Sequence, residues 1–245
     1  MKKLNTLFLS IFFMTLSLGV SSQNITLKIG IDPTFAPMEY QDDDFNLVGF
    51  DVDLMNAIAQ EGNFKVKFIE TGFNGMFSQL AMGGVDAVIS GITILDERKK
   101  TMDFSLPYLQ ADEVVFTSSS SPDIHDFKDL EGRTVATQSG AEVCISALSK
   151  LVEKYNIKTK FYDSLDDGIA DLGKGAIQGF VYDSTIFWSP DYKGKINILG
   201  NPLMEGFYGI AVKKNNTKIL NMINENLQKI IDSGKMKEIQ NKWLK

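Results

Sequence analysis

The stretch TLKIGI, residues 26–31, opens the pattern that decides the fold of this 245-residue chain. Apolar and polar side chains alternate along it, which is typical of a β-strand with one buried face. Apolar positions then recur at helical spacing over residues 52–62, with Asp51 in the place of an N-terminal cap. A second alternating segment follows at residues 65–70. These segments predict a strand, a helix and a strand, in that order.

The pattern continues with a second helix, predicted over residues 75–82. Asn74 is expected to cap its first turn, and the glycines at positions 83 and 84 are expected to end it. The apolar stretch 86–90 then predicts a third strand. The order β-α-β-α-β is that of a parallel sheet covered by helices.

A second block of the same kind follows the serine-rich stretch 118–122, which is expected to be a surface loop. Its predicted strands and helices alternate, at residues 133–137, 141–155, 158–162, 165–174 and 178–182. The tail predicts a strand at residues 207–212 and helices at residues 218–233 and 236–244. The repetition of the block predicts an α/β chain with two lobes.

Residues 1–22 have the layout of a secretory signal peptide, with Lys2 and Lys3 before an apolar run and small residues after it. A membrane anchor is the alternative, but the run is short for a span of about 20 residues and no positive stop follows it. No cysteine stands directly after the run, so we expect no lipid anchor. The mature chain is therefore expected to be free in an extracytoplasmic space such as a periplasm.

Charge and composition exclude several classes of partner and chemistry. The net charge is -6, and it becomes -8 without residues 1–22, which argues against binding to nucleic acid or to a membrane surface. Cys144 and His125 are the only cysteine and histidine, so neither an intramolecular disulfide nor a His/Cys metal site is predicted. His125 also lies in a polar loop, which argues against catalysis by a Ser-His-Asp or Cys-His arrangement.

The predicted site lies in four loops. In open parallel sheets ligands collect beyond the carboxyl ends of the strands, which here are Ile31, Ser90, Thr137 and Tyr182. The loops that follow them carry a cation, acids, hydroxyls, glycines and aromatic rings. A free amino acid needs a planar donor for its carboxylate and an acid for its ammonium group, and these loops offer both.

Arg98 is the cation of these loops. It lies near the start of a short predicted helix, where the helix dipole disfavours a positive charge, and an external anion would relieve that placement. The alternative is a local ion pair with Asp96 or Glu97 on a solvated face. The residues by themselves leave both readings open.

Two longer motifs resemble a known family. The segment GFDVDL at residues 49–54, continued by IA at 58–59, resembles the signature of the family 3 bacterial extracellular solute-binding proteins. The segment ITILDERKK at 92–100, followed by DFS at 103–105, is similar to the block that supplies the carboxylate-binding arginine in the glutamine- and lysine/arginine/ornithine-binding members. The resemblance extends in order from Leu27 to the terminal NKWL.

The resemblance implies a two-lobed periplasmic-binding-protein fold of type II, in which each lobe is a sheet flanked by helices and the ligand cleft lies between the lobes. Residues 23–108 and 209–245 would form lobe 1 and residues 109–208 lobe 2, with chain crossings near residues 108–111 and 204–208. The implied function is capture of a free L-amino acid by hinge closure and delivery to the membrane permease of an ABC transporter. We expect a monomer without cofactor.

The resemblance also implies roles for individual residues. Arg98 would bind the ligand α-carboxylate, while the Gly91 carbonyl, Thr93 and Asp183 would meet the α-ammonium. The other implied residues surround the carboxylate or the side chain: the N–H groups of Ala141 and Glu142, the walls Phe35 and Phe73, and the far-end residues Asp32, Gln138 and Tyr182. Without the resemblance, core packing would be the favoured reading of the two phenylalanines.

The chain departs from the family pattern after Gly140, where Ala141 and Glu142 replace small hydroxyl or glycine residues. The added acid, together with Asp32, predicts that arginine, lysine, histidine or glutamine is preferred over glutamate and aspartate. Glu142 pointing into solvent is the open alternative. The alternative function is a periplasmic dehydratase of the cyclohexadienyl/arogenate type with Glu142 as general acid. A binding protein rather than an enzyme is predicted, because Asp183 and Thr93 suit an ammonium better than a second carboxylate.

Overall fold

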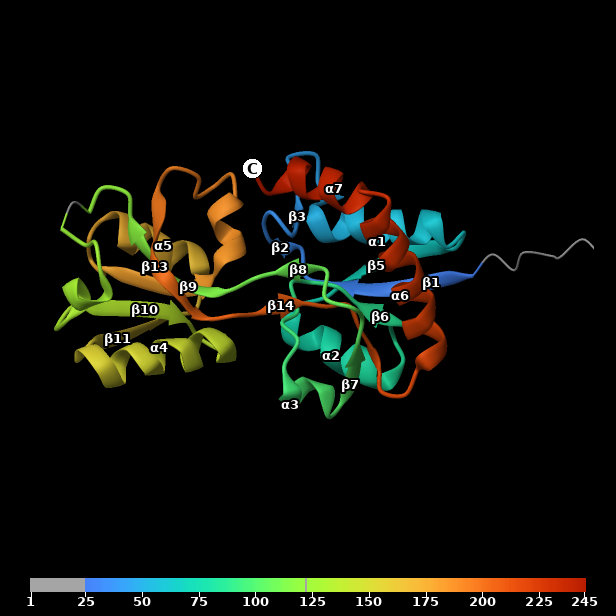
Figure 1. Cartoon of the computed structure of the whole chain (residues 1–245), viewed down its shortest axis with the longest axis horizontal. Coiled ribbons are helices and arrows are strands. Elements are labelled where there is room, and N and C mark those ends of the chain that lie inside the picture. Colours follow the sequence, from blue (N-terminus) through green and yellow to red (C-terminus); the bar gives the residue numbers. More distant parts are fainter. Residues whose placement is uncertain (1–24, 122) are drawn as a thin grey trace, which may run out of the picture.

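The computed structural model describes residues 25–121 and 123–245, so the predicted signal peptide lies outside the described residues. The described chain forms two lobes, each built on a five-stranded sheet (Figure 1). Both lobes mix parallel and antiparallel strands and carry helices on both faces of the sheet. The predicted α/β class with two lobes is confirmed. Within the described residues no helix is long and apolar enough to cross a membrane.

The sheet of lobe 1 has the order β5-β1-β6-β15-β7. Its strands are β1 Thr26–Ile31, β5 Lys65–Glu70, β6 Ala87–Val88, β7 Met102–Phe104 and β15 Ala211–Lys213. β1 pairs in parallel with β5 and β6, as the first predicted block requires, while β15 is antiparallel to β6 and β7. The C-terminal part of the chain therefore returns to complete this sheet.

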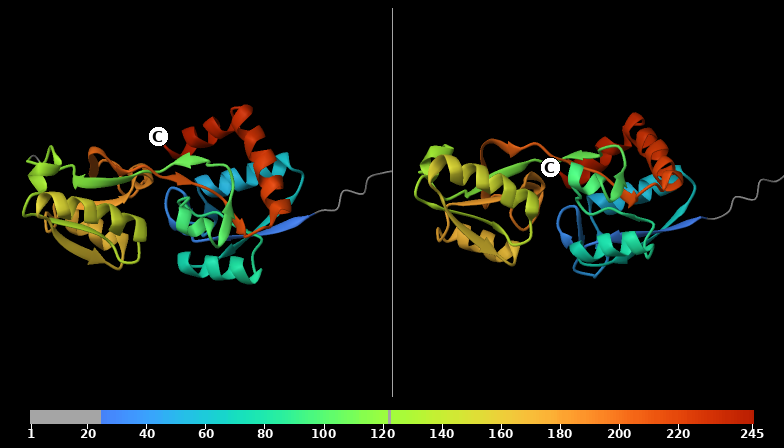
Figure 2. Two further views of the ribbon diagram at one scale, coloured as in Figure 1. Left: turned by 60° about the horizontal axis from the view of Figure 1, so that its bottom comes forward. Right: turned by 90° about the horizontal axis from the view of Figure 1, so that it is seen from below.

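Helices cover both faces of the lobe 1 sheet. They are α1 Phe50–Glu61, α2 Phe73–Met82, the short α3 Asp96–Lys99, α6 Thr217–Asp232 and α7 Lys235–Trp243. One buried cluster joins β1 to α1, α6 and α7, and a second cluster joins α2 to β6 and β7. The two clusters make a three-layer arrangement, in which the sheet lies between helices and β1 runs towards lobe 2 (Figure 2).

The sheet of lobe 2 has the order β11-β10-β12-β9-β13. Its strands are β9 Glu113–Ser118, β10 Thr134–Gln138, β11 Lys158–Tyr162, β12 Gly179–Asp183 and β13 Ile196–Met204. The helices α4 Glu142–Tyr155 and α5 Leu165–Gly173 lie on opposite faces, accompanied by the short 3-10 turns η1 Phe127–Leu130 and η2 Ser184–Trp188. Neither β9 nor β13 was predicted from the sequence. β9 is buried at every position and shows no alternation that would identify it.

Two chain segments connect the lobes. β8 Leu109–Gln110 and β14 Phe207–Tyr208 pair antiparallel between the two large sheets, near both predicted crossings. The remaining strands, β2 Thr34–Phe35, β3 Glu39–Gln41 and β4 Leu47–Val48, form a small antiparallel sheet after β1. A two-stranded connection of this kind is what a hinge between lobes requires.

Two predicted helix caps are wrong, and both for tertiary reasons. α1 begins after Gly49, and Asp51 is a fully buried residue of its first turn that accepts hydrogen bonds from distant groups. α2 begins at Phe73, whose N–H donates to Asp32 Oδ2 at 2.8 Å, so a carboxylate from the end of β1 takes the role expected of Asn74.

Candidate functional site

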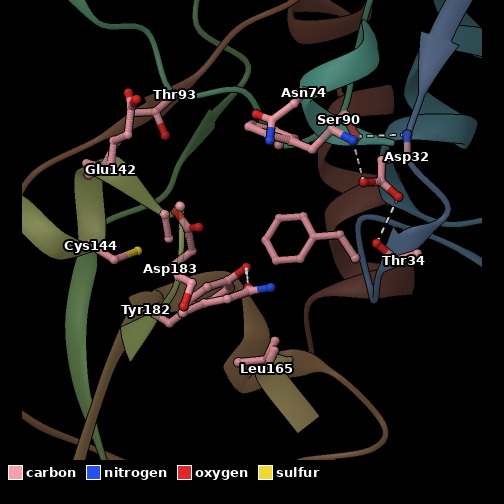
Figure 3. Close-up of a pocket in the computed structure, with 18 of the residues that line it drawn as sticks. Asp32, Thr34, Asn74, Ser90, Thr93, Glu142, Cys144, Leu165, Tyr182 and Asp183 are labelled. Atoms are coloured by element: carbon pink, nitrogen blue, oxygen red, sulfur yellow. Dashed lines mark hydrogen bonds between the residues drawn. The ribbon is translucent and has the colours of Figure 1, made fainter. Parts of the chain in front are cut away.

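A cavity of about 390 Å³ lies between the lobes, within the size range of small-molecule sites. All eleven residues that the sequence singled out line it: Asp32, Phe35, Phe73, Gly91, Thr93, Arg98, Gln138, Ala141, Glu142, Tyr182 and Asp183. Figure 3 shows how the side chains from the two lobes converge, with Asp32 on one side and Tyr182 and Asp183 on the other. The structure therefore brings the four predicted loops to one place.

Arg98 has no ion-pair partner within 4.0 Å among the described residues, which contradicts the local-pair reading. Its neighbours Asp96 and Glu97 are engaged by Lys99 at 2.9 Å and Lys100 at 2.5 Å. The Arg98 guanidinium instead donates from Nη1 to the Thr93 carbonyl at 3.0 Å.

The rings of Phe73 and Phe77 fix the position of this guanidinium, which lies 5.7 Å and 5.4 Å from their centroids. Burial lowers the pKa of Arg98 from its usual value, while Glu142, Asp183 and Glu113 act in the opposite direction. The result is a positioned cation with free donors at the cavity wall.

Asp183 forms an acidic end of the cavity together with two residues that the sequence analysis did not single out as site residues. Glu113 and Cys144 lie beside it, and the Cys144 sulfur and one carboxylate oxygen from each acid all lie within 4.8 Å of one another. The Cys144 thiol donates to Glu113 Oε2 at 3.0 Å.

Burial raises the pKa of each group at this end. Burial raises the pKa of Asp183 well above its ordinary range, and Glu113 raises it further. Burial also raises the pKa of the Glu113 carboxyl and of the Cys144 thiol. The three groups therefore favour their protonated forms more than exposed counterparts would.

Gly91 is held by a buried network behind the cavity. Its N–H donates to Asp51 Oδ2 at 2.9 Å, and the Tyr108 hydroxyl donates to the same oxygen at 2.9 Å. Ser90, the preceding residue, donates from its hydroxyl to Glu39 Oε1 at 2.5 Å. Burial raises the pKa of Asp51 to about 7 and that of Glu39 well above its ordinary value. This pair of carboxyl groups positions the loop that the sequence predicts to carry ligand contacts.

Position 91 also requires glycine. Its φ is +54°, in the left-handed region, and a Cβ atom there would lie 2.6 Å from Cε1 of the Phe35 ring. The backbone of this loop can therefore approach the cavity and the Phe35 ring closely.

Aromatic rings close one side of the cavity. Phe35 of lobe 1 meets the edge of Tyr182 of lobe 2, with ring centroids 6.1 Å apart. The Tyr182 hydroxyl donates to Gln138 Oε1 at 2.9 Å, and Gln138 Nε2 donates to the Asp163 carbonyl at 3.2 Å. These three predicted residues thus form a connected wall.

Asp32 is already engaged in local hydrogen bonds. Its Oδ1 accepts from the Thr34 hydroxyl at 2.8 Å, and its Oδ2 accepts from the Phe73 N–H. Asp32 therefore orders the start of α2 and the Phe73 ring in addition to facing the cavity.

Ala141 and Glu142 lie at the start of α4. Their N–H groups, predicted to bind the ligand carboxylate, donate instead within the turn, to Gln138 at 3.3 Å and Gly140 at 3.0 Å. In this structure those donors are in use, and a ligand would have to displace these turn hydrogen bonds. The side chain of Glu142 is exposed and lies at the mouth of the cavity near Thr93 (Figure 3).

Sequence reasoning did not single out several other residues that line the cavity, among them Glu39, Ser90, Glu113 and Cys144. Ser90 ends a predicted strand directly before Gly91, so the rule that ligands collect at the carboxyl ends of strands could have identified it. Glu113 is an acid next to the apolar run VVF, a placement that commonly indicates a functional or paired charge. Cys144 and Glu39 gave no such signal, because only the folded chain brings them to the cavity.

The chain is similar to known proteins over nearly all of its described length. Residues 27–245 match the model of the bacterial extracellular solute-binding proteins, family 3. A probable histidine-binding protein of Neisseria gonorrhoeae is 34% identical over 224 residues, which are 88% of this chain and 82% of that protein. The ABC transporter arginine-binding protein 1 of Escherichia coli K12 is 28% identical over 251 residues, 99% of each chain.

The solved structure of an ancestral arginine-binding protein bound to arginine is also similar. It superimposes with a TM-score of 0.76 at 32% identity and covers 90% of this chain and 98% of its own. All three relatives are named as binding proteins, which supports a binding protein and not the dehydratase alternative. Because the family model spans nearly all of the described chain, the protein belongs to the bacterial extracellular solute-binding proteins, family 3.

Proposed function

We propose that the protein captures a free L-amino acid with a basic or polar side chain outside the cytoplasm and delivers it to an ABC transporter. The observation that carries this proposal is the charge distribution of the cavity. Arg98 is the one cationic side chain among the described residues that line it, and it has no ion-pair partner within 4.0 Å there. Six carboxyl side chains line the same cavity: Asp32, Glu39, Glu113, Glu142, Asp166 and Asp183.

This distribution suits a zwitterion. Arg98 offers a planar fork to the ligand carboxylate, and Asp183, from the other lobe, offers a charged partner to the ammonium. The excess of acids favours a further positive charge or N–H donors on the ligand side chain. Relatives named for arginine and histidine support arginine, lysine, histidine or glutamine as the ligand class.

The proposed mechanism is hinge closure. Arg98 and Phe73 belong to the proposed lobe 1, residues 23–108 and 209–245, while Asp183 and Gln138 belong to the proposed lobe 2, residues 109–208. A ligand that contacts both lobes stabilises the closed arrangement more than the open one, so binding energy is converted into closure. The β8 and β14 connection would bend. The closed monomer would then dock on its membrane permease in a periplasm, to which the signal peptide directs the chain before it is cleaved.

A thermal-shift screen against the twenty standard amino acids tests the proposal. A ligand at 100 times its dissociation constant should stabilise the folded protein by about 2.7 kcal/mol. We expect arginine, lysine, histidine or glutamine to give the largest shift and glutamate and aspartate the smallest. Calorimetric titration of the best ligand should then give a stoichiometry of one. A panel in which no amino acid raises the melting temperature would refute the proposal.

A further inference from the structure

Two carboxyl groups at the acidic end of the cavity lie opposite each other in neighbouring strands. In the antiparallel pairing of β12 with β9, Asp183 faces Glu113 directly. Like charges in directly opposed positions of a sheet are destabilising, even at a solvated surface. Here Glu113 is only 1% exposed, so solvent does little to screen the repulsion.

Each of the two carboxyl groups has an unpaired oxygen. Glu113 Oε1 and Asp183 Oδ1 are buried and have no hydrogen-bond partner among the described residues. A buried acceptor without a partner costs free energy, and an ionised one costs more. Both residues line the cavity, so the missing donors can come from a ligand.

The groups around the pair do not neutralise two charges. Arg98 of α3 is the one cation among the described residues that line the cavity, and it lowers the pKa of both carboxyl groups. In the proposed function Arg98 binds the ligand carboxylate. Cys144 of α4 donates to Glu113. The other groups beside the pair are neutral or negative: Tyr182 of β12, Tyr208 of β14 and Asp112 before β9. Glu142 of α4 lines the same cavity and acts on Arg98. One proton held between the two carboxyl groups relieves this arrangement.

We propose that Glu113 is a second acidic residue of the ammonium end of the site, and that the Glu113–Asp183 pair releases a shared proton when the ligand ammonium enters. The inference rests on the proposed amino-acid binding. On binding, the ammonium donates N–H groups to the unpaired oxygens and its charge replaces that of the proton, which passes to solvent. Burial raises the pKa of both carboxyl groups, and Glu113 raises that of Asp183 further, which agrees with this exchange.

The exchange sets the sign of the pH dependence. Ligand binds to the deprotonated pair, so affinity should rise with pH while the pair of the empty protein titrates. For release of one full proton the slope is about tenfold in affinity per pH unit, and it vanishes once the empty protein has lost the proton.

Calorimetric titration of the full mature chain with L-arginine, in two buffers that differ in heat of ionisation, measures the protons released. At pH values below the range in which the carboxyl pair titrates, we expect the release to approach one proton per bound ligand. L-glutamine, which has a neutral side chain, should give the same release, because the α-ammonium is responsible. Glu113→Gln should lower the release towards zero and flatten the pH dependence of affinity. Glu131→Gln, an exposed acid of the same lobe, is the matched control.

Wild-type binding without proton release and with a flat pH profile would overturn the inference and leave the proposed function standing. Release with arginine but not with glutamine would overturn it too, since the side chain would then be the cause. A zinc ion that binds stoichiometrically and is lost in Glu113→Gln would show that the cluster holds a metal instead. If Glu113→Gln does not fold, the wild-type pH profile and the comparison of arginine with glutamine still test whether the pair releases a proton. Failure of every amino acid to bind would refute both proposals.

Discussion

Replacement of Arg98 by alanine is the sharpest test of how the site works. The guanidinium is held by the Thr93 carbonyl at 3.0 Å and by two phenylalanine rings, and its nearest acids along the chain are engaged by Lys99 and Lys100. In Arg98→Ala the ligand carboxylate would be buried without a cation in a cavity that contains six acids. Truncation of one member of such a pair costs about 2 to 5 kcal/mol.

That cost corresponds to a loss of affinity of about 30-fold to several thousand-fold. The upper part of the range is expected, because the remaining carboxyl groups repel the ligand carboxylate. Arg98→Lys should recover only part of the loss, since an ammonium cannot reproduce the planar fork or the stacking on Phe73 and Phe77. Isothermal calorimetry with the best ligand of the amino-acid panel measures both variants.

The control for this test is Lys237→Ala, which removes an exposed cation that does not line the cavity. Its affinity should stay within about twofold of wild type, because an exposed charge outside the cavity contributes little to ligand binding. Circular dichroism melting separates loss of folding from loss of binding. Near-normal affinity in a folded Arg98→Ala variant would refute the assignment of this residue.

Three further predictions concern acids of the site and of its support. Asp183→Asn should weaken all amino-acid ligands by a similar factor in parallel titrations, because the α-ammonium is common to them; selective loss of one ligand would instead place Asp183 at the side-chain end. Glu142→Gln should narrow the preference for arginine over glutamine in competition binding, with a smaller change at high salt because the side chain is exposed; an unchanged ranking would return specificity to Asp32, Gln138 and Tyr182. The pKa of Asp51 is raised from an ordinary value near 3.8 to about 7 in the folded state. Between these two pH values the folded state binds a proton on Asp51 that the unfolded state has lost. The contribution of Asp51 to the free energy of unfolding should therefore fall as pH rises from about 4 to about 7. The melting temperature of wild type minus that of Asp51→Asn, followed across this range, measures the contribution, and a rising difference would contradict it.

The sequence by itself determined the parts of this protein that depend on local pattern. Alternation identified β1 and β5, and the helical pattern identified α1, α4 and α6, because each of these elements turns one face towards the core. The rule that ligands collect beyond parallel strand ends, together with motif resemblance, then identified eleven residues that the structure finds around one cavity. Arg98 was among them, but its neighbours Asp96 and Glu97 left its partner undecided.

Only the tertiary structure decided which groups face one another. Pairing of Lys99 with Asp96 and of Lys100 with Glu97 left Arg98 for the cavity. The strand β9 escaped prediction because it is buried at every position, and without β9 the opposition of Glu113 to Asp183 could not be found. Asp51 has the sequence position of a helix cap, yet it supports Gly91 from 40 positions away. Strand register and burial bring such groups together across long separations, and no local pattern in the chain records those contacts.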